Sequence, residues 1–278
     1  MKTIIITTDF SKSALNAARY AVALAKSIGA HKLVLYHSYD SVPIGTDIPT
    51  TEVIPPHAYE QSLTELKSVQ EELETMLGNN TDINISVVVN DFPLLRGIEL
   101  LAEEHDVAFV VAGTTGRSNL EQVLMGSNTV NLASSLKLPL LIVPKDALFV
   151  PIHKIVFACD LKKVSSSTPV NEIDQWLNRL SASLLVLHVD IKGKRIDPDG
   201  VTEQYEMHRL LDRFRPEYHY TESEDIAGEI EGFARDHSAG LIITIPKSYS
   251  FFERLFRQSV SKQLIKKSNV PLLLLQEK

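Results

Sequence analysis

The sequence predicts an α/β fold made of two tandem domains, each an open five-stranded parallel sheet covered by helices on both faces. Two observations lead to this prediction. β-branched apolar runs alternate along the chain with segments of helical periodicity, as in parallel sheets with right-handed crossovers. A unit of roughly 140 residues also occurs twice in the sequence, and such an internal repeat predicts two copies of one structure.

The repeat consists of three matched segments in the same order. KTIIITTDFS resembles HKIVFACDLK, and each reaches an aspartate, Asp9 or Asp160, after a β-rich run. KLVLYHSYD resembles SLLVLHVDI, with His37 and His188 separated by the same interval as the aspartates. SLKLPLLIVPK resembles KKSNVPLLLLQE near the end of each copy. The copies therefore share their element order.

The first copy contains the strands and helices of a complete unit. Strands are expected at residues 2–7, 33–38, 84–89, 107–112 and 139–143. Helices are expected over 13–29, with a serine cap and a stop at Gly29, over 59–78, over 93–105, with Pro93 in the first turn, and over 127–137. Residues 40–56 contain prolines and few apolar residues, which predicts a long loop, and such loops tend to be functional or mobile.

The second copy is shorter in its middle. The join near KDALFVPIHK divides the chain into domains 1–148 and 149–278. Residues 190–220 are expected to pass from strand to loop to helix. A further helix is expected over 225–237, and the fourth and fifth strands within 239–247 and 270–276.

Composition excludes several classes of function. The chain has 278 residues, 44% of them hydrophobic, and a net charge of -7, which argues against general nucleic-acid binding. The apolar run near the N-terminus is too short for a signal peptide or a membrane span. The single cysteine, Cys159, excludes an internal disulfide and suits a reducing compartment. We therefore expect a cytoplasmic protein that does not enter membranes.

Three glycines stand out in VVAGTTGRSNLEQVLMGSNTV, residues 110–130. Gly113 falls at the carboxyl end of a predicted strand, and Gly116 and Gly126 precede a predicted helix that starts near Ser127. Unpaired backbone N–H groups and the helix dipole favour an anion at such a position. The hydroxyl groups of Ser127 and Thr129 add possible donors to phosphate oxygens.

Asp9 supports a nucleotide in this place. It ends the first strand, and ligands of open parallel sheets bind beyond the carboxyl ends of the strands. Asp9 could therefore face Gly113 across a crevice and bind ribose hydroxyls. The alternative is that the glycines are ordinary loop residues and bind no ligand. There is no G-x-x-x-x-G-K-[ST] loop and no dinucleotide fingerprint after the first strand.

The chain resembles a tandem member of the universal stress protein family, whose ATP-binding members carry glycine, two residues, glycine, nine residues, glycine and Ser or Thr. Gly113, Gly116, Gly126 and Ser127 match that spacing. The resemblance implies two Rossmann-like domains packed as a pseudo-dimer within one chain. It also implies that the first domain binds ATP, or AMP or ADP, with Mg²⁺ or Mn²⁺ held by the phosphates. Carried over, the nucleotide-binding residues are Thr7, Asp9, Ser38, Ala112, Gly113, Thr114, Gly116, Gly126, Ser127, Asn128 and Thr129.

The second copy departs from this pattern. Ile245, Ser248 and Gln258 stand where the first copy has its glycines, and only Ser259 matches Ser127. We expect no standard nucleotide site there. Residues 246–267 are basic and aromatic, which indicates either a surface for a protein partner or an anion, or a helix packed on its own domain.

Other candidates are weaker. His37 and His188 are structural residues or, alternatively, ligands or bases, His57 is an exposed loop residue, and Trp176 belongs to the core. Two functions remain: a stress-response regulator that binds an adenine nucleotide and acts on an unknown protein partner, or an interaction protein with a relic motif. Hydrolysis is at most slow, because neither a catalytic lysine nor a positioned base is evident. The chain could also form a homodimer.

Overall fold

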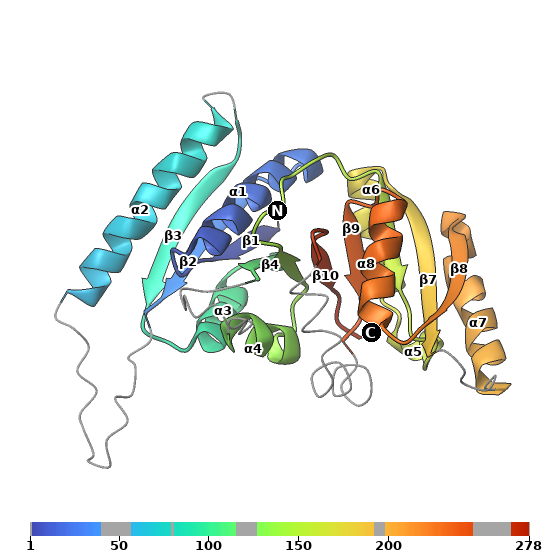
Figure 1. The fold of residues 1–278 in the computed structure, drawn as a ribbon. Coiled ribbons are helices and arrows are strands. Elements are labelled where there is room, and N and C mark those ends of the chain that lie inside the picture. Colours follow the sequence, from blue (N-terminus) through green and yellow to red (C-terminus); the bar gives the residue numbers. More distant parts are fainter. Residues whose placement is uncertain are drawn as a thin grey trace, which may run out of the picture.

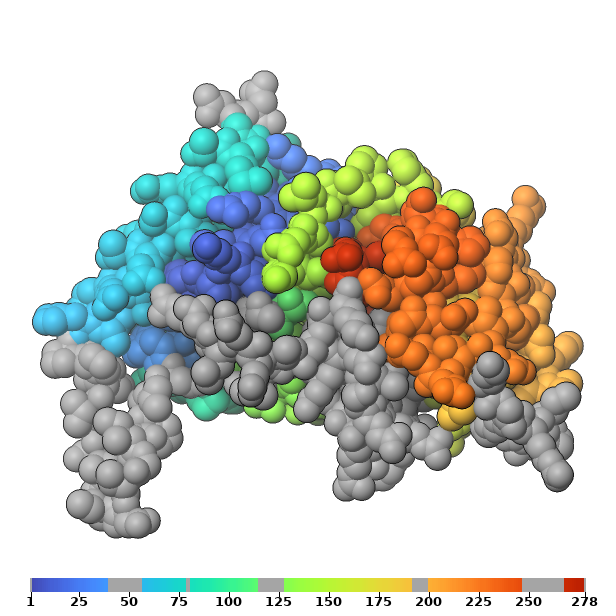
Figure 2. Space-filling model, in the orientation of Figure 1, coloured from blue at the N-terminus to red at the C-terminus, as the bar shows by residue number. Residues whose placement is uncertain are grey.

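The computed structural model contains one continuous ten-stranded sheet in the order β3-β2-β1-β4-β5-β10-β9-β6-β7-β8 (Figure 1). The two halves of the chain lie side by side around it (Figure 2). The structure describes residues 2–39, 57–78, 81–114, 127–191, 198–246 and 268–277.

The first half supplies five parallel strands in the order β3-β2-β1-β4-β5. Their bounds lie within two residues of the predicted ones: β1 Thr3–Thr7, β2 Lys32–Ser38, β3 Asn84–Asn90, β4 Val107–Gly113 and β5 Leu140–Val143. The prediction for this half is confirmed.

The second half repeats that order, with β8, β7, β6, β9 and β10 in the equivalent places. Its strands are β6 Lys154–Ala158, β7 Ser183–Ile191, β8 Glu217–Ser223, β9 Leu241–Thr244 and β10 Leu272–Leu274. The sequence analysis did not place β8, because EYHYTES lacks the apolar run of a buried strand.

The two halves join through their last strands. β5 and β10 pair antiparallel, with Leu141 opposite Leu273 at the centre. All other strand pairs in the described sheet are parallel. The predicted pseudo-dimer is therefore one sheet that runs through both halves. The predicted domain boundary at residues 148–149 falls in the connection between β5 and β6.

Helices cover both faces of the sheet, as predicted. Side chains alternate along β1, so that Ile4 and Ile6 face one core and Ile5 faces the other. One core includes buried residues of α1 Lys12–Ile28, α2 Ala58–Leu77, α5 Val164–Ser167, α6 Val170–Leu180 and α7 Pro198–Leu211. The other includes α3 Leu94–Glu104, α4 Ser127–Ser135 and α8 Ile226–Asp236. A short 3₁₀ turn, η1 Asp212–Phe214, follows α7.

Two helix starts differ from the prediction. Ser11, rather than Ser13, caps α1, because its side chain accepts a hydrogen bond from the N–H of Ala14 at 3.2 Å. Ser13 is instead buried inside the first turn. Pro93 occupies the cap of α3, one residue before the first turn. The stop of α1 at Gly29 is confirmed, with φ at 64° in the left-handed region.

The two halves share a core, and the connection between them is bonded to α1. The ring of Trp176 on α6 lies 5.0 Å from that of Phe109 on β4, and Trp176 is only 5% exposed. The side-chain amide of Asn16 donates to the carbonyl oxygens of Pro144 at 3.1 Å and Ala147 at 2.9 Å. These contacts fasten the connection after β5 to α1. The prediction that Trp176 belongs to the core is confirmed.

The first helix of the repeat is continuous in one half and interrupted in the other. α1 has 17 residues, whereas its counterpart consists of the four-residue α5 and the 11-residue α6, separated at Thr168 and Pro169. Proline has no N–H to donate and clashes with a preceding helical turn, which explains the break. No helix in the described part of the chain is long and apolar enough to cross a membrane.

Candidate functional site

The site predicted for the first half lies where β1 and β4 end side by side. The hydroxyl of Thr7 at the end of β1 donates to the carbonyl oxygen of Val111 on β4 at 3.0 Å. Thr7 is buried and therefore holds the two strand ends together. This hydroxyl is engaged across the sheet, so the described contact of Thr7 is with the protein itself.

Asp9 is held in the turn between β1 and α1. Its Oδ1 accepts a hydrogen bond from the N–H of Ser11 at 3.0 Å. Phe10, the next residue, has φ at 63°, so the chain turns sharply between the strand and the helix. The carboxylate therefore occupies a defined position at the strand ends.

Gly113 is required for packing. A Cβ atom at this position would lie 2.7 Å from Oγ of Ser13 and 2.8 Å from its carbonyl oxygen. Only glycine lets the first turn of α1 approach the end of β4 this closely. The sequence analysis assigned Gly113 to an anion-binding segment, whereas the contact that the structure describes is with the protein's own helix.

Thr129 ties α4 to the same strand. Its hydroxyl donates to the carbonyl oxygen of Gly113 at 2.8 Å, and Thr129 is buried. The hydroxyl was predicted as a possible phosphate donor, but the buried carbonyl already accepts its proton. Thr129 thereby places the first turn of α4, with its N–H groups, directly beside the end of β4.

The remaining predicted residues lie around these contacts. Ala112 and Thr114 are buried on either side of Gly113, and the N–H of Thr114 donates to the carbonyl oxygen of Val143 at 3.2 Å. Ser127 begins α4, and Asn128 is exposed in its first turn. Gly116 and Gly126 lie outside the described residues.

Ser38, one of the nucleotide-binding residues that the family resemblance implies, is the last residue of β2. Its hydroxyl donates to the carbonyl oxygen of Phe92 at 2.5 Å, and the N–H of Tyr39 donates to Asn90 O at 3.1 Å. These bonds fix the ends of β2 and β3 together. The predicted long loop that follows, residues 40–56, lies outside the described residues.

His37 and its counterpart His188 have structural contacts. Nδ1 of His37 lies 2.8 Å from the carbonyl oxygen of Thr8, and Nδ1 of His188 lies 2.8 Å from that of Cys159. Both rings brace the turn after the first strand of their half. This supports the structural interpretation over a role as ligand or base. His57 is the exposed residue before α2.

Described residues of the second half enclose a small cavity at the equivalent strand ends. A cavity of about 10 Å³ lies between the ends of β6 and β9, and such a volume admits about one water molecule. Ile245, which aligns with Gly113, contributes to its walls. The other lining residues are Phe157, Ala158, Cys159, Asp160, Thr168 and Thr244. Ser248, Gln258 and Ser259 lie outside the described residues, as does the basic segment after Pro246.

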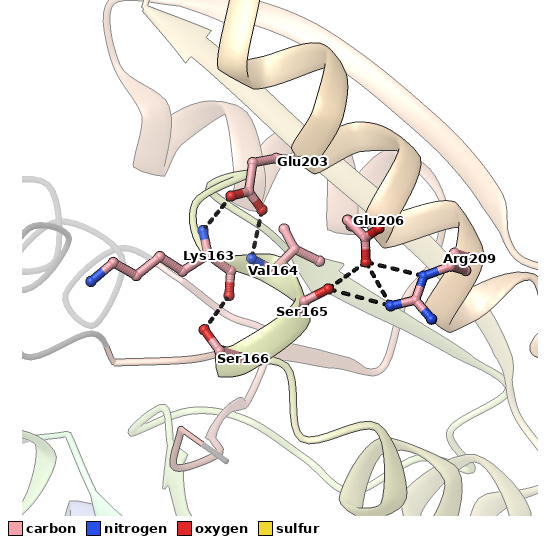
Figure 3. A network of polar contacts seen from close by, with 7 residues as sticks. All are labelled: Lys163, Val164, Ser165, Ser166, Glu203, Glu206 and Arg209. Carbon is pink, nitrogen blue, oxygen red and sulfur yellow. Dashed lines mark hydrogen bonds and ion pairs between the residues drawn. The ribbon is translucent and has the colours of Figure 1, made fainter.

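α7 also packs against the segment that joins β6 to α5 (Figure 3). The carboxylate of Glu203 accepts hydrogen bonds from the N–H groups of Lys163 at 3.0 Å and Val164 at 2.7 Å. Glu206 accepts from Ser165 and Arg209, and these hydrogen bonds lower the pKa of its carboxyl group. The carboxylate of Glu203 thus accepts the N–H groups at the start of α5.

α2, the counterpart of α7, contacts its neighbour elsewhere. The Nε of Arg19 lies 2.6 Å from a carboxylate oxygen of Glu72, and Lys26 donates to the carbonyl oxygen of Leu77 at 3.0 Å. Both contacts involve later turns of α1. The two halves therefore differ around the turn between their first strand and first helix, which the sequence did not reveal.

Comparisons with known proteins agree with this fold and repeat. Residues 1–144 match the universal stress protein family, so the chain belongs to that family. It is 30% identical over 146 residues to universal stress protein MJ0531 of Methanocaldococcus jannaschii, covering 52% of this chain and 82% of that protein. It is 25% identical to universal stress protein Slr1230 of Synechocystis sp. over 98% of this chain and 99% of the relative.

A solved structure shows the same overall fold. The crystal structure of a universal stress protein from Archaeoglobus fulgidus aligns with a TM-score of 0.72 at 17% identity, covering 99% of this chain and 96% of that one. The similarity to this structure and to Slr1230 spans both halves of the chain.

Proposed function

We propose that the chain is a cytosolic stress-response protein that binds one adenine nucleotide per molecule in its first half and acts as a nucleotide-dependent regulator or interaction module. The nucleotide is ATP, AMP or ADP. Its base would lie near Ser38, its ribose near Asp9, and its phosphates at the start of α4.

The attachment of α4 to β4 is the observation that carries this proposal. The hydrogen bond from Thr129 to the carbonyl oxygen of Gly113 sets a nine-residue helix to begin at the end of a central strand. The first N–H groups of a helix have no partner within the helix and favour an anion. Asp9 belongs to the adjacent strand end, where a carboxylate can accept hydrogen bonds from ribose hydroxyls.

The described residues would support such a nucleotide by fixing the positions of the strand ends and helix starts around it. Thr7, Ser38 and Thr129 use their hydroxyl groups to join strand ends and helix starts. Phosphate contacts would then come from backbone N–H groups, with Gly116, Gly126 and Ser127 completing them as the family resemblance implies. A Mg²⁺ or Mn²⁺ ion bound by the phosphates would offset their charge. We expect hydrolysis to be slow at most.

Isothermal titration of nucleotide-free protein with ATP and magnesium tests this function. A stoichiometry near one is expected, since Ile245, Ser248 and Gln258 replace the three glycines in the second half. No heat and no thermal shift would favour the alternative, a nucleotide-independent interaction protein with a relic motif.

The repeat offers a matched pair of variants. Asp9 and Asp160 each accept a backbone N–H two residues ahead, from Ser11 at 3.0 Å and from Lys162 at 3.2 Å. Asp9→Ala and Asp160→Ala therefore remove similar turn contacts. We expect only Asp9→Ala to weaken nucleotide binding, about tenfold or more, because an unmade hydrogen bond from a ligand to a charged group costs 1.5–3 kcal/mol. Equal affinities in both variants would place the ligand elsewhere.

A further inference from the structure

Tyr39 is a half-buried aromatic residue at the base end of the proposed site. It follows Ser38 directly, and its own N–H donates to the carbonyl oxygen of Asn90 at 3.1 Å. The backbone of Tyr39 is therefore fixed to the end of β3. Its ring meets that of Tyr59 edge-on, with the ring centroids 6.5 Å apart.

Tyr59 belongs to the first turn of α2 and is 47% exposed. The start of this helix has weak local support. His57 occupies the cap position but makes no side-chain hydrogen bond to the described first turn, and its Nδ1 lies 4.0 Å from the carboxylate of Glu60. A helix start without a capping side chain frays more readily. Contact with Tyr39 is thus a means of holding the first turn of α2 against the sheet.

The surroundings of Tyr39 disfavour the ionised form of its hydroxyl. Partial burial raises the pKa of Tyr39, and so do the nearby Asp91, Tyr59 and Glu60. The ring, which is neutral at physiological pH like that of an ordinary tyrosine, belongs to the first residue after the end of β2. Planar bases bind to aromatic rings by stacking.

We propose that Tyr39 contacts the base of the bound nucleotide and that Tyr59 transmits this contact to the first turn of α2. This inference rests on the proposed function, and it adds a base-contacting residue and a route by which occupancy reaches the protein surface. A base stacked on Tyr39 would fix its ring, and a fixed ring would hold Tyr59 and reduce fraying of α2. The surface of α2 around Tyr59 would then differ between the free and bound protein.

The test uses AMP as the probe with the full chain. Tyr39→Leu keeps an apolar side chain but removes the aromatic face, and it should weaken AMP binding about tenfold. Binding of ribose 5-phosphate, which has no base, should change less than twofold. Tyr205→Ala, which removes a 67% exposed tyrosine from α7, is the matched control and should leave both affinities unchanged.

Hydrogen–deuterium exchange of a peptide covering residues 57–66 tests the transmission. AMP should slow exchange in the wild type several-fold, while Tyr59→Ala should bind AMP and lose this protection. The inference is overturned, while the proposed function stands, if Tyr39→Leu binds AMP as tightly as the wild type or if AMP does not change the exchange rate of the α2 peptide. If the wild type binds neither AMP nor ATP, both are overturned. Circular dichroism melts of each variant separate these outcomes from misfolding.

Discussion

Replacing Gly113 by alanine tests how the strand ends and helix starts of the site fit together. The new Cβ atom would lie 2.7 Å from Oγ of Ser13 and 2.8 Å from its carbonyl oxygen. Rotation of the Ser13 side chain relieves the first contact but leaves the second, because that oxygen belongs to the backbone of α1. Either the end of β4 or the first turn of α1 must therefore move.

The expected cost follows from this geometry. Forcing an extra carbon into a packed interior destabilises proteins by about 1–3 kcal/mol. For a chain of this size, that cost lowers Tm by roughly 2–12 °C, at about 2–4 °C per kcal/mol. Nucleotide affinity should fall as well, since Thr129 positions α4 through the Gly113 carbonyl oxygen.

Thermal and urea melts of Gly113→Ala measure the effect, and Gly232→Ala is the matched control. Gly232 lies within α8, and the nearest atom to an added Cβ is in the flexible side chain of Arg235 at 3.9 Å. That change should stabilise the protein by about 0.5–1 kcal/mol, because alanine favours helix. If Gly113→Ala melts at the wild-type temperature, the assignment of Gly113 to packing against α1 is wrong.

Three further predictions concern stability. Trp176→Ala should lower the free energy of unfolding in urea by about 3–5 kcal/mol, because it leaves a cavity beside Phe109 in the shared core. A smaller loss than that caused by replacing an exposed tyrosine such as Tyr205 with alanine would contradict this packing. Gly29→Ala should cost about 1 kcal/mol by the same measurement, since φ is 64° there, and an unchanged midpoint would contradict the left-handed cap. Glu206 should stabilise the fold above its ordinary pKa of 4.5, and this contribution should disappear as pH falls through the lowered folded pKa. Glu206→Gln should flatten the acid limb of a Tm–pH profile, whereas a wild-type profile in the variant would refute the contribution.

Local sequence was sufficient for most secondary structure. The β-branched runs of the first half lie within two residues of the observed strands, and Gly29 and Gly78 follow the last residues of α1 and α2. Each of these features depends on conformational preferences of residues that are close in the chain. β8 was not placed, because an edge strand with half-polar faces has no continuous apolar run.

The predicted site and its counterpart in the second half depend on contacts between residues far apart in the chain. Thr7 and Val111 are bonded although they are 104 positions apart, and Glu203 reaches Val164 across 39 positions. The sequence pattern of a glycine near a helix start rich in hydroxyl groups is the same whether a ligand or Ser13 lies against the glycine. The distinction depends on how closely α1 approaches β4, which the local sequence does not encode.

The sequence by itself determined the repeat, the alternation of strands and helices, the family and the loss of the glycine pattern in the second half. These follow from local preferences and from comparison of one half with the other. The tertiary structure decided that β5 and β10 join the halves into one sheet, that Gly113 admits α1, and that α7 covers the turn before α5. Local preferences determine the conformation of a segment. Many segments have similar apolar and polar faces, so only the packing of the whole chain determines which of them contact each other.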